Sequence, residues 1–195
     1  AGGSISHATG TNANSFRFIN TNTTSQWSFG TNSPGIQNAG DYLAFNRLPN
    51  GGSWSEFARI DSSGNVGIGV IPNSWDSRFR AIQVGSANYF SFSAQNTAAA
   101  YGSILWNAYG TGDETFAYNK TGDAATRFAQ QYDFKWYLAP SGTAGNTISF
   151  TQAMTLNTSG NLLVGATSSI YSSEKLSVYK GGGGVGAAFS NDTRT

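Results

Sequence analysis

The sequence contains no cysteine and a single histidine, His7. It therefore forms no disulfide, and one histidine alone makes neither a metal site nor a Ser-His-Asp triad. Charged residues make up 11% of the chain, less than half of the roughly 25% usual in soluble domains. The formal net charge is +1 and Lys and Arg form no run, so nothing electrostatic indicates a nucleic-acid partner. No apolar run approaches the roughly 18 residues of a membrane-spanning helix, so we expect no membrane insertion.

Aromatic residues, in contrast, are plentiful at 14% of the chain. Short segments in which apolar and polar residues alternate recur from end to end, which is the pattern of β-strands. Turn-forming segments such as TNSPG, PNGG and TSGN separate them. The sequence predicts an all-β chain, with helix-compatible residues in a short window at 97–101. Because aliphatic residues are few, we expect burial between subunits to supplement a thin core.

One segment occurs twice. Residues 59–69 read RIDSSGNVGIG and residues 155–165 read TLNTSGNLLVG, and matching positions keep one constant offset. The pattern predicts a short hairpin in which Asp61 bonds to the backbone of the turn and Gly64 takes a left-handed conformation beside a bulge. The second copy offers the same parts. The predicted structural turn residues are Asp61, Gly64, Asn65, Asn157, Gly160 and Asn161.

Two glycines follow the first turn. Gly67 and Gly69 alternate with apolar residues, so one face of this strand carries only glycine. A face of this kind lets another backbone approach closely. We expect that approach around a threefold axis; the alternative is an ordinary hairpin with a flat face.

The repeat extends beyond the turns and divides the chain. The tripeptide YLA at residues 42–44 returns at residues 137–139, and a Pro/Gly-rich loop follows each copy. The predicted units are the end of one β module at 1–58, a shaft-like hairpin repeat at 59–85, a β module with loops that could face a ligand at 86–153, a second hairpin repeat at 154–181 and the start of a further module at 182–195.

The segment ARIDSSGNVGIGVIP, followed by AIQVG, and its counterpart AMTLNTSGNLLVGATSSIYSSEKLSVYKG resemble the shaft repeat of tailed-phage tail fibres and tailspikes. The resemblance implies repeated β-hairpin and β-sandwich modules in a parallel homotrimeric fibre, in which three chains wrap one axis. It implies an extracellular location in a virion tail fibre. The implied partners are other copies of the chain, other virion tail proteins and a bacterial surface polysaccharide or lipopolysaccharide. Such chains often end in a self-cleaving chaperone domain.

Candidates for ligand contact lie in GSILWNAYG and GTGDETFAYNK, between Gly102 and Lys120. Aromatic faces cover the apolar C–H surfaces of sugars, and amide and carboxylate groups bond to hydroxyls. The alternative is that the tryptophans pack in the core of the trimer. The candidates are Trp106, Asn107, Tyr109, Asp113, Tyr118 and Asn119, with Trp54 and Trp75 as second candidates.

The ten carboxylates form no persuasive catalytic pair. Asp113 and Glu114 are adjacent, and adjacent strand residues point to opposite faces. In a loop they could converge, and a glycosidase needs two carboxyl groups at a defined separation. No Asp-x-Asp-x-Asp-Gly loop indicates calcium. We therefore expect no enzymatic activity, no metal and no cofactor.

The predicted function is structural and adhesive: a segment of a trimeric phage tail fibre that presents surfaces for attachment to a bacterial cell-surface glycan. Two alternatives stay open. One is a tailspike module that depolymerises the glycan, with a carboxylate pair across a subunit boundary. The other is a bacterial extracellular β-repeat adhesin.

Overall fold

A computed structural model describes residues 3–10, 13–20, 25–31, 42–85, 90–96, 101–168, 175–180 and 184–185. The described residues are all-β, as the sequence predicts. They contain no helix, and so none that is long and apolar enough to cross a membrane. The predicted helical window lies outside these ranges except for Tyr101, as does the expected module at 182–195 except for a two-residue strand.

Strands account for most of the described chain. They are β1 (Gly3–Gly10), β2 (Ala13–Asn20), β3 (Gln26–Thr31), β4 (Leu43–Leu48), β5 (Ser55–Ile60), β6 (Val66–Ile68), β7 (Phe79–Val84), β8 (Phe90–Gln95), β9 (Gly102–Trp106), β10 (Ala108–Gly112), β11 (Thr115–Tyr118), β12 (Ala125–Gln130), β13 (Phe134–Ala139), β14 (Thr151–Leu156), β15 (Leu162–Val164), β16 (Leu176–Lys180) and β17 (Gly184–Val185).

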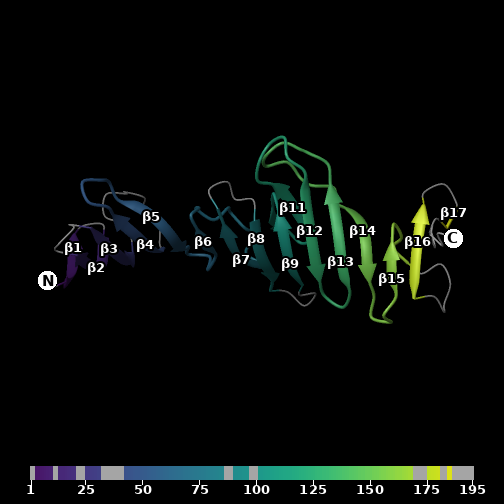
Figure 1. Ribbon diagram of the computed structural model, residues 1–195, viewed down its shortest axis with the longest axis horizontal. Helices are drawn as coiled ribbons and strands as arrows, with labels where there is room; N and C mark the ends of the chain where they lie inside the picture. Colours follow the sequence, from purple (N-terminus) through teal and green to yellow (C-terminus); the bar gives the residue numbers. More distant parts are fainter. Residues whose placement is uncertain are drawn as a thin grey trace, which may run out of the picture.

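One 15-stranded sheet runs the length of the molecule, with β1 and β17 at opposite ends (Figure 1). Its strands follow the order of the chain, except that the separate hairpin β10–β11 is inserted between β9 and β12. Neighbouring strands are antiparallel at every step but two, β6–β7 and β15–β16, which are parallel. Each parallel step follows one copy of the sequence repeat, so the repeat marks the two places where the antiparallel alternation of the sheet is interrupted.

Each copy of the repeat forms the same hairpin, β5–β6 or β14–β15. The Asx bond expected of Asp61 is present, because its Oδ1 accepts the N–H groups of Ser63 (2.9 Å) and Asn65 (2.8 Å). Asn157 Oδ1 accepts the equivalent pair, at 3.0 and 2.9 Å. Gly64 and Gly160 have φ of 81° and 74°, in the left-handed region that closes such a turn.

Both copies also place a bulge before the turn. The pairing of β4 with β5 shifts so that Phe57 has no partner, and that of β13 with β14 leaves out Ala153. The carbonyl of Phe57 accepts the N–H of Gly69 at 2.7 Å, and that of Ala153 accepts the N–H of Gly165 at 2.9 Å. The two copies therefore share the hydrogen bonds of the bulge as well as those of the turn.

Gly67, on the glycine-only face, is approached closely by the chain's own backbone. A Cβ on Gly67 would overlap the carbonyl oxygen of Val70 and lie 2.8 Å from Pro72 Cδ, both in the chain's own connection from β6 to β7. The backbone that approaches Gly67 thus belongs to the same chain. The second copy has Leu163 at this position, 2% exposed, so the close approach is not a common feature of the repeat.

The two YLA tripeptides are not equivalent. Residues 42–44 lie at the start of β4, where Leu43 pairs with Ile60 beside the turn. Residues 137–139 end β13, where Leu138 pairs with Thr151 at the far end of β14. The two tripeptides therefore occupy different positions relative to the hairpin that follows them.

A turn variant tests the shared hairpin. Asp61→Ala removes the acceptor of two backbone N–H groups and should lower the free energy of unfolding by about 1–2 kcal/mol. Asp61→Asn should retain most of that stability, because Asn157 makes the same two bonds in the second copy. Urea unfolding of both variants provides the comparison. An equal loss for Asn and Ala would mean that charge, and not the Asx geometry, stabilises the turn.

Candidate functional site

The first candidate surface is one face of the long sheet, which we call the apolar face. Residues that are directly paired across strands point to the same side of a sheet. In this register, one row of apolar partners crosses ten strands without a buried member. The row consists of Ile60, Val66, Ile82, Phe92, Ile104, Phe128, Trp136, Met154, Val164 and Val178.

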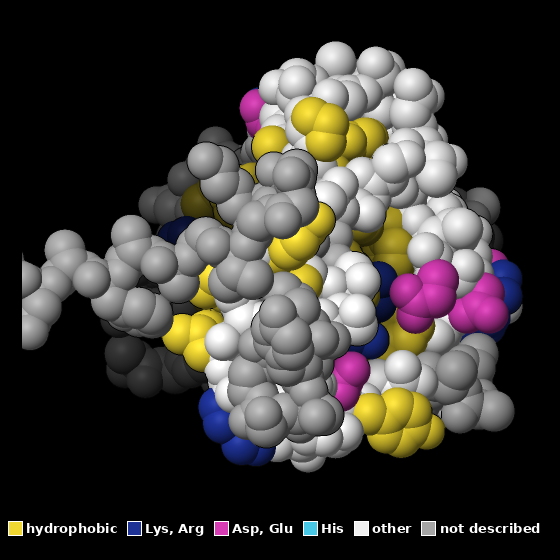
Figure 2. All heavy atoms as spheres, turned by 90° about the vertical axis from the view of Figure 1, so that its right-hand side faces the viewer, with side chains coloured by type: hydrophobic (Ala, Val, Ile, Leu, Met, Phe, Trp, Pro, Cys, Tyr) yellow, Lys and Arg dark blue, Asp and Glu magenta, His cyan; other side chains and the backbone are white. Residues whose placement is uncertain are grey.

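Four members of this row are exposed and the other six are half-buried. Phe92 is 45% exposed, and Ile82 and Ile104 on either side of it are 43% and 39% exposed. A parallel row adds Val84 and Trp106, at 37% and 47%. Viewed from the β17 end of the sheet, hydrophobic side chains reach the surface in several clusters (Figure 2). Monomeric soluble proteins rarely expose continuous apolar patches of more than a few hundred Å², so this face has the character of an interface.

The opposite face is covered, yet it carries many polar side chains. Gln83 and Ser91 are fully buried there, and Arg127 is 5% exposed. The hairpin β10–β11 lies on the same side, because its Phe116 packs on Phe79 of β7 with ring centroids 5.9 Å apart. The usual relation, an apolar side inside and a polar side in water, is therefore inverted over this part of the sheet.

A compact core fills the space beneath the hairpin. Phe79 lies at its centre, 1% exposed, and contacts the rings of Trp75 (5.6 Å), Tyr101 (6.2 Å) and Phe116. The buried members are Trp75, Phe79, Ala81, Tyr101, Leu105, Ala108, Phe116, Tyr118, Ala125, Ala139 and Ile148.

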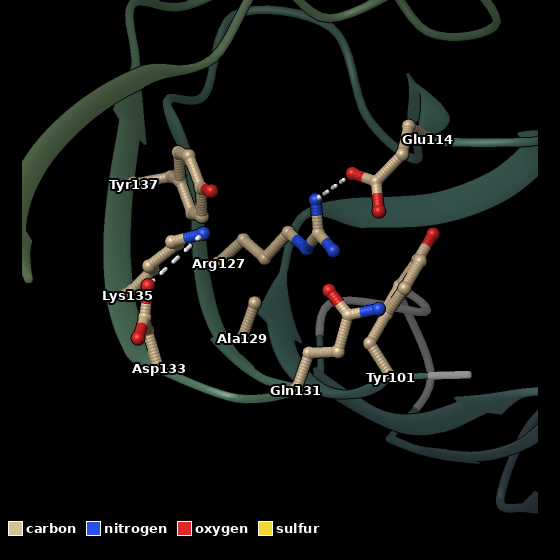
Figure 3. A pocket seen from close by; sticks show the side chains of 8 residues that line it. All are labelled: Tyr101, Glu114, Arg127, Ala129, Gln131, Asp133, Lys135 and Tyr137. Atoms are coloured by element: carbon tan, nitrogen blue, oxygen red, sulfur yellow. Dashed lines mark hydrogen bonds and ion pairs between the residues drawn. The ribbon is translucent and has the colours of Figure 1, made fainter. Parts of the chain in front are cut away.

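The second candidate site is a cavity of about 150 Å³ beside this core, which we call the Arg127 pocket. The Arg127 side chain extends through it between Tyr137 and Tyr101 toward Glu114 (Figure 3). Its Nε donates to Ser103 Oγ at 3.0 Å, and its Nη1 donates to Glu114 Oε2 at 3.1 Å. The lining residues are Tyr101, Glu114, Arg127, Ala129, Gln131, Asp133, Lys135 and Tyr137.

Aromatic rings surround the Arg127 guanidinium. Its Cζ lies 4.5 Å from the ring centres of Tyr101 and Phe116 and 5.3 Å from that of Tyr137. Cation–π contacts of this kind contribute about 0.5–2 kcal/mol each and hold the group in one orientation. The pocket is thus built around a fixed, buried cation.

Two carboxylates lie at the pocket. Glu114 sits in the β10–β11 turn with φ of 52°, and its side chain is 60% exposed. Asp133 lies in the turn between β12 and β13, and its Oδ2 is 3.6 Å from Lys135 Nζ. Its Oδ1 accepts a hydrogen bond from the N–H of Thr158 at 3.2 Å. Two cations and two anions therefore line the cavity, and their formal charges cancel.

Tyr101 is the buried titratable group of the pocket. Its hydroxyl is buried, and the backbone N–H of Glu114 is a weak donor to its oxygen. Burial raises the pKa of Tyr101 to about 12, because the phenolate would lose its solvation. A phenol in water has a pKa of about 10.

This raised pKa predicts an alkaline effect. The folded state keeps the Tyr101 proton to higher pH than the unfolded state, so its contribution to stability is full below about pH 10 and is lost as pH rises toward 12. Tyr101→Phe lacks this loss and should equal or exceed the wild type at neutral pH, since it removes a buried hydroxyl that has only a weak hydrogen bond. Urea midpoints of both proteins at pH 8 and pH 11.5 measure the difference. If the difference in urea midpoint between the two proteins is the same at pH 8 and at pH 11.5, the raised pKa of Tyr101 is contradicted.

Two of the six predicted ligand residues support the fold. Asn107 is fully buried; its amide donates to the Asp123 carbonyl at 2.9 Å and its Oδ1 accepts the Lys120 N–H at 2.8 Å. Tyr118 is 6% exposed, and its hydroxyl donates to the Pro140 carbonyl at 2.7 Å. Both side chains are therefore packed inside the single chain.

The aromatic candidates lie in different places. Trp106 is on the apolar face, whereas Tyr109 packs edge-on against Trp75 at 6.3 Å. Trp75 itself is buried in the core. Trp54 lies 5.5 Å below the guanidinium of Arg17. The structure therefore does not bring these rings together as one binding surface.

The polar candidates also diverge. Asp113 accepts a bond from Gln95 Nε2 at 2.7 Å, and Asn119 Oδ1 accepts one from Asn73 Nδ2 at 2.9 Å. Asp113 and Glu114 lie in a turn, as one alternative allowed, but their carboxylates bond to different partners. Across the ranges that the structure describes, no group of three or more His, Cys, Asp or Glu side chains could hold a metal ion.

Comparison with known proteins adds no family. No protein-family model matches the chain, and no curated protein matches it.

Proposed function

We propose that the chain is a structural segment of a homotrimeric fibre that attaches to a bacterial surface glycan, of the kind found in tailed-phage tail fibres. The observation that carries this is the continuous apolar face, which a single chain leaves in water. Burying one large apolar side chain contributes about 1.5–3 kcal/mol, so covering the row would stabilise an assembly strongly. Other copies of the chain are the occupants we propose.

The number of copies and the setting follow from the resemblance of the two hairpin repeats to shaft repeats. In this proposal three sheets turn their apolar faces inward around one axis, and the covered faces, with the β10–β11 hairpin, point outward. Affinity for the cell surface then comes from several equivalent sites on one rigid rod, which share a high effective concentration.

The mass in solution tests the assembly. Light scattering at low and high protein concentration should give three times the chain mass of 20.5 kDa at both. A monomer at both concentrations would contradict the proposed role of the apolar face. A stable dimer would retain the interface but contradict the trimer.

Glycan cleavage is the weaker alternative. Hydrolysis needs one carboxyl group that carries a proton to the leaving oxygen. Glu114 and Asp133 both line the Arg127 pocket, but each is already engaged in an ion pair, with Arg127 at 3.1 Å and with Lys135 at 3.6 Å. We therefore propose binding without cleavage; release of reducing ends from a bound polysaccharide would contradict this.

A further inference from the structure

The Arg127 pocket opens on the side of the sheet away from the apolar face. Successive residues of a strand point to opposite sides, and Phe128 of the apolar row lies between Arg127 and Ala129, which both line the pocket. An assembly that buries the apolar face would leave the pocket accessible. The inference below rests on the proposed function in this respect.

The pocket is built as a site and is more than a gap between side chains. Its Arg127 is 5% exposed, and the guanidinium contacts Glu114 through one carboxylate oxygen. Arg59, another buried arginine, differs: its Nε and Nη2 bond to both oxygens of Glu56, at 2.5 and 2.7 Å. Arg59 therefore bonds to both carboxylate oxygens of its partner, whereas Arg127 bonds to one oxygen of Glu114 and borders a cavity.

The pocket also has aromatic walls. The rings of Tyr101 and Tyr137 line it on either side of Arg127 (Figure 3). The Tyr101 hydroxyl is buried beside the Glu114 backbone, so a ligand would meet the ring and not the hydroxyl. Aromatic faces cover the apolar C–H surfaces of sugars.

The charges of the pocket define the kind of ligand. Glu114, 60% exposed, stands at the opening and would repel an anion, and the charges of Arg127 and Lys135 are offset by those of Glu114 and Asp133. The walls present donors and acceptors side by side. Hydroxyl groups both donate and accept, so a neutral polyol satisfies such a wall better than a carboxylate or an ammonium group does.

The size of the pocket limits the ligand further. At about 150 Å³ the cavity is below the 300–1,000 Å³ typical of sites for drug-sized ligands. It suits a single small ring. We propose that the Arg127 pocket binds one neutral monosaccharide unit, with Arg127 and Glu114 bonding to its hydroxyls and the rings of Tyr101 and Tyr137 covering its C–H surface.

Saturation-transfer NMR tests this with galactose, glucose and N-acetylglucosamine as neutral probes, and with N-acetylneuraminic acid and glucuronic acid as anionic ones. At least one neutral sugar should bind with a Kd of about 1–10 mM, which is typical of a site with few contacts. The anionic probes should bind at least about tenfold more weakly. Absence of binding by every neutral sugar at about 50 mM would overturn the proposal.

Variants then assign the binding to the pocket. Glu114→Gln leaves a net positive pocket and should reverse the preference, so that the anionic sugar binds more tightly than the neutral one. Tyr137→Ala removes an aromatic wall of the pocket and should weaken neutral-sugar binding at least about threefold. Asp123→Asn makes the same charge change at an exposed carboxylate that pairs with Lys120 outside the pocket. It should change neither the affinity for the neutral sugar nor the preference between neutral and anionic sugars. An unchanged preference in Glu114→Gln, or an equal effect of Asp123→Asn, would refute the site.

The mass of the same samples separates this inference from the proposed function. A trimer that binds no neutral sugar refutes the pocket and leaves the assembly intact. A monomer that binds the sugar refutes the assembly and leaves the pocket intact.

Discussion

Phe92→Glu is expected to convert the assembly into single chains. Phe92 lies between Ile82 and Ile104 in the apolar row, so its replacement places a carboxylate where other copies of the chain would pack. Burial of an unpaired charge costs several kcal/mol, and dissociation should occur at concentrations at least about 100-fold higher than for the wild type. Because Phe92 is 45% exposed in the single chain, the fold itself should remain intact.

Tyr132→Glu is the matched control. It also introduces glutamate at an exposed aromatic position, but Tyr132 is 79% exposed and lies in the turn between β12 and β13. Light scattering over a dilution series should show the trimer mass for Tyr132→Glu and falling mass for Phe92→Glu, with equal circular dichroism. A trimer of Phe92→Glu at micromolar concentration would show that the apolar face is not the interface.

The second large effect is expected inside the chain. Phe79→Ala removes the central ring of the core beneath β10–β11 and should cost about 3–5 kcal/mol of unfolding free energy. The cost should not depend on protein concentration, because Phe79 is 1% exposed and its ring contacts are all within one chain. Urea unfolding followed by tryptophan fluorescence reports on it directly, since Trp75 touches the Phe79 ring.

Phe92→Ala provides the comparison. The same atoms are removed, but from the apolar face, so its effect on stability should grow with protein concentration. If Phe79→Ala costs less than about 1 kcal/mol, or if its cost varies with concentration, the core beneath the hairpin has been wrongly identified.

Turn chemistry was the most predictable part of this fold. Asp61 and Gly64 act within five residues, so their roles depend on local geometry alone, and the same bonds recur at Asn157 and Gly160. Longer segments were less readable. Residues 127–139 alternate throughout and look like one strand, yet β12 ends at Gln130 and β13 begins at Phe134. The turn between them lacks glycine and proline, so no residue type marked it.

The two candidate surfaces, the apolar face and the Arg127 pocket, could not be predicted from the sequence for a different reason. Alternation along β8 shows that Phe92 and Ser91 lie on opposite faces, but not which face is covered. The usual assumption puts phenylalanine inside, and here Ser91 is buried and Phe92 is not. The Arg127 pocket joins β12 to a turn of the inserted hairpin, and no local spacing connects Arg127 with Glu114. A lone arginine inside an alternating strand was the one available signal.

The order of the strands has a consequence for how the molecule forms. Almost every pairing joins neighbours along the chain, and the exception, β9 with β12, spans only the inserted hairpin. Few long loops must close before contacts form, so the entropic barrier is low and we expect rapid folding, strand by strand, as the chain emerges. The sheet can therefore be complete while its apolar face is still in water. If the proposed assembly forms, we expect encounter between finished chains, and not the search for native pairing, to be its slow and concentration-dependent step.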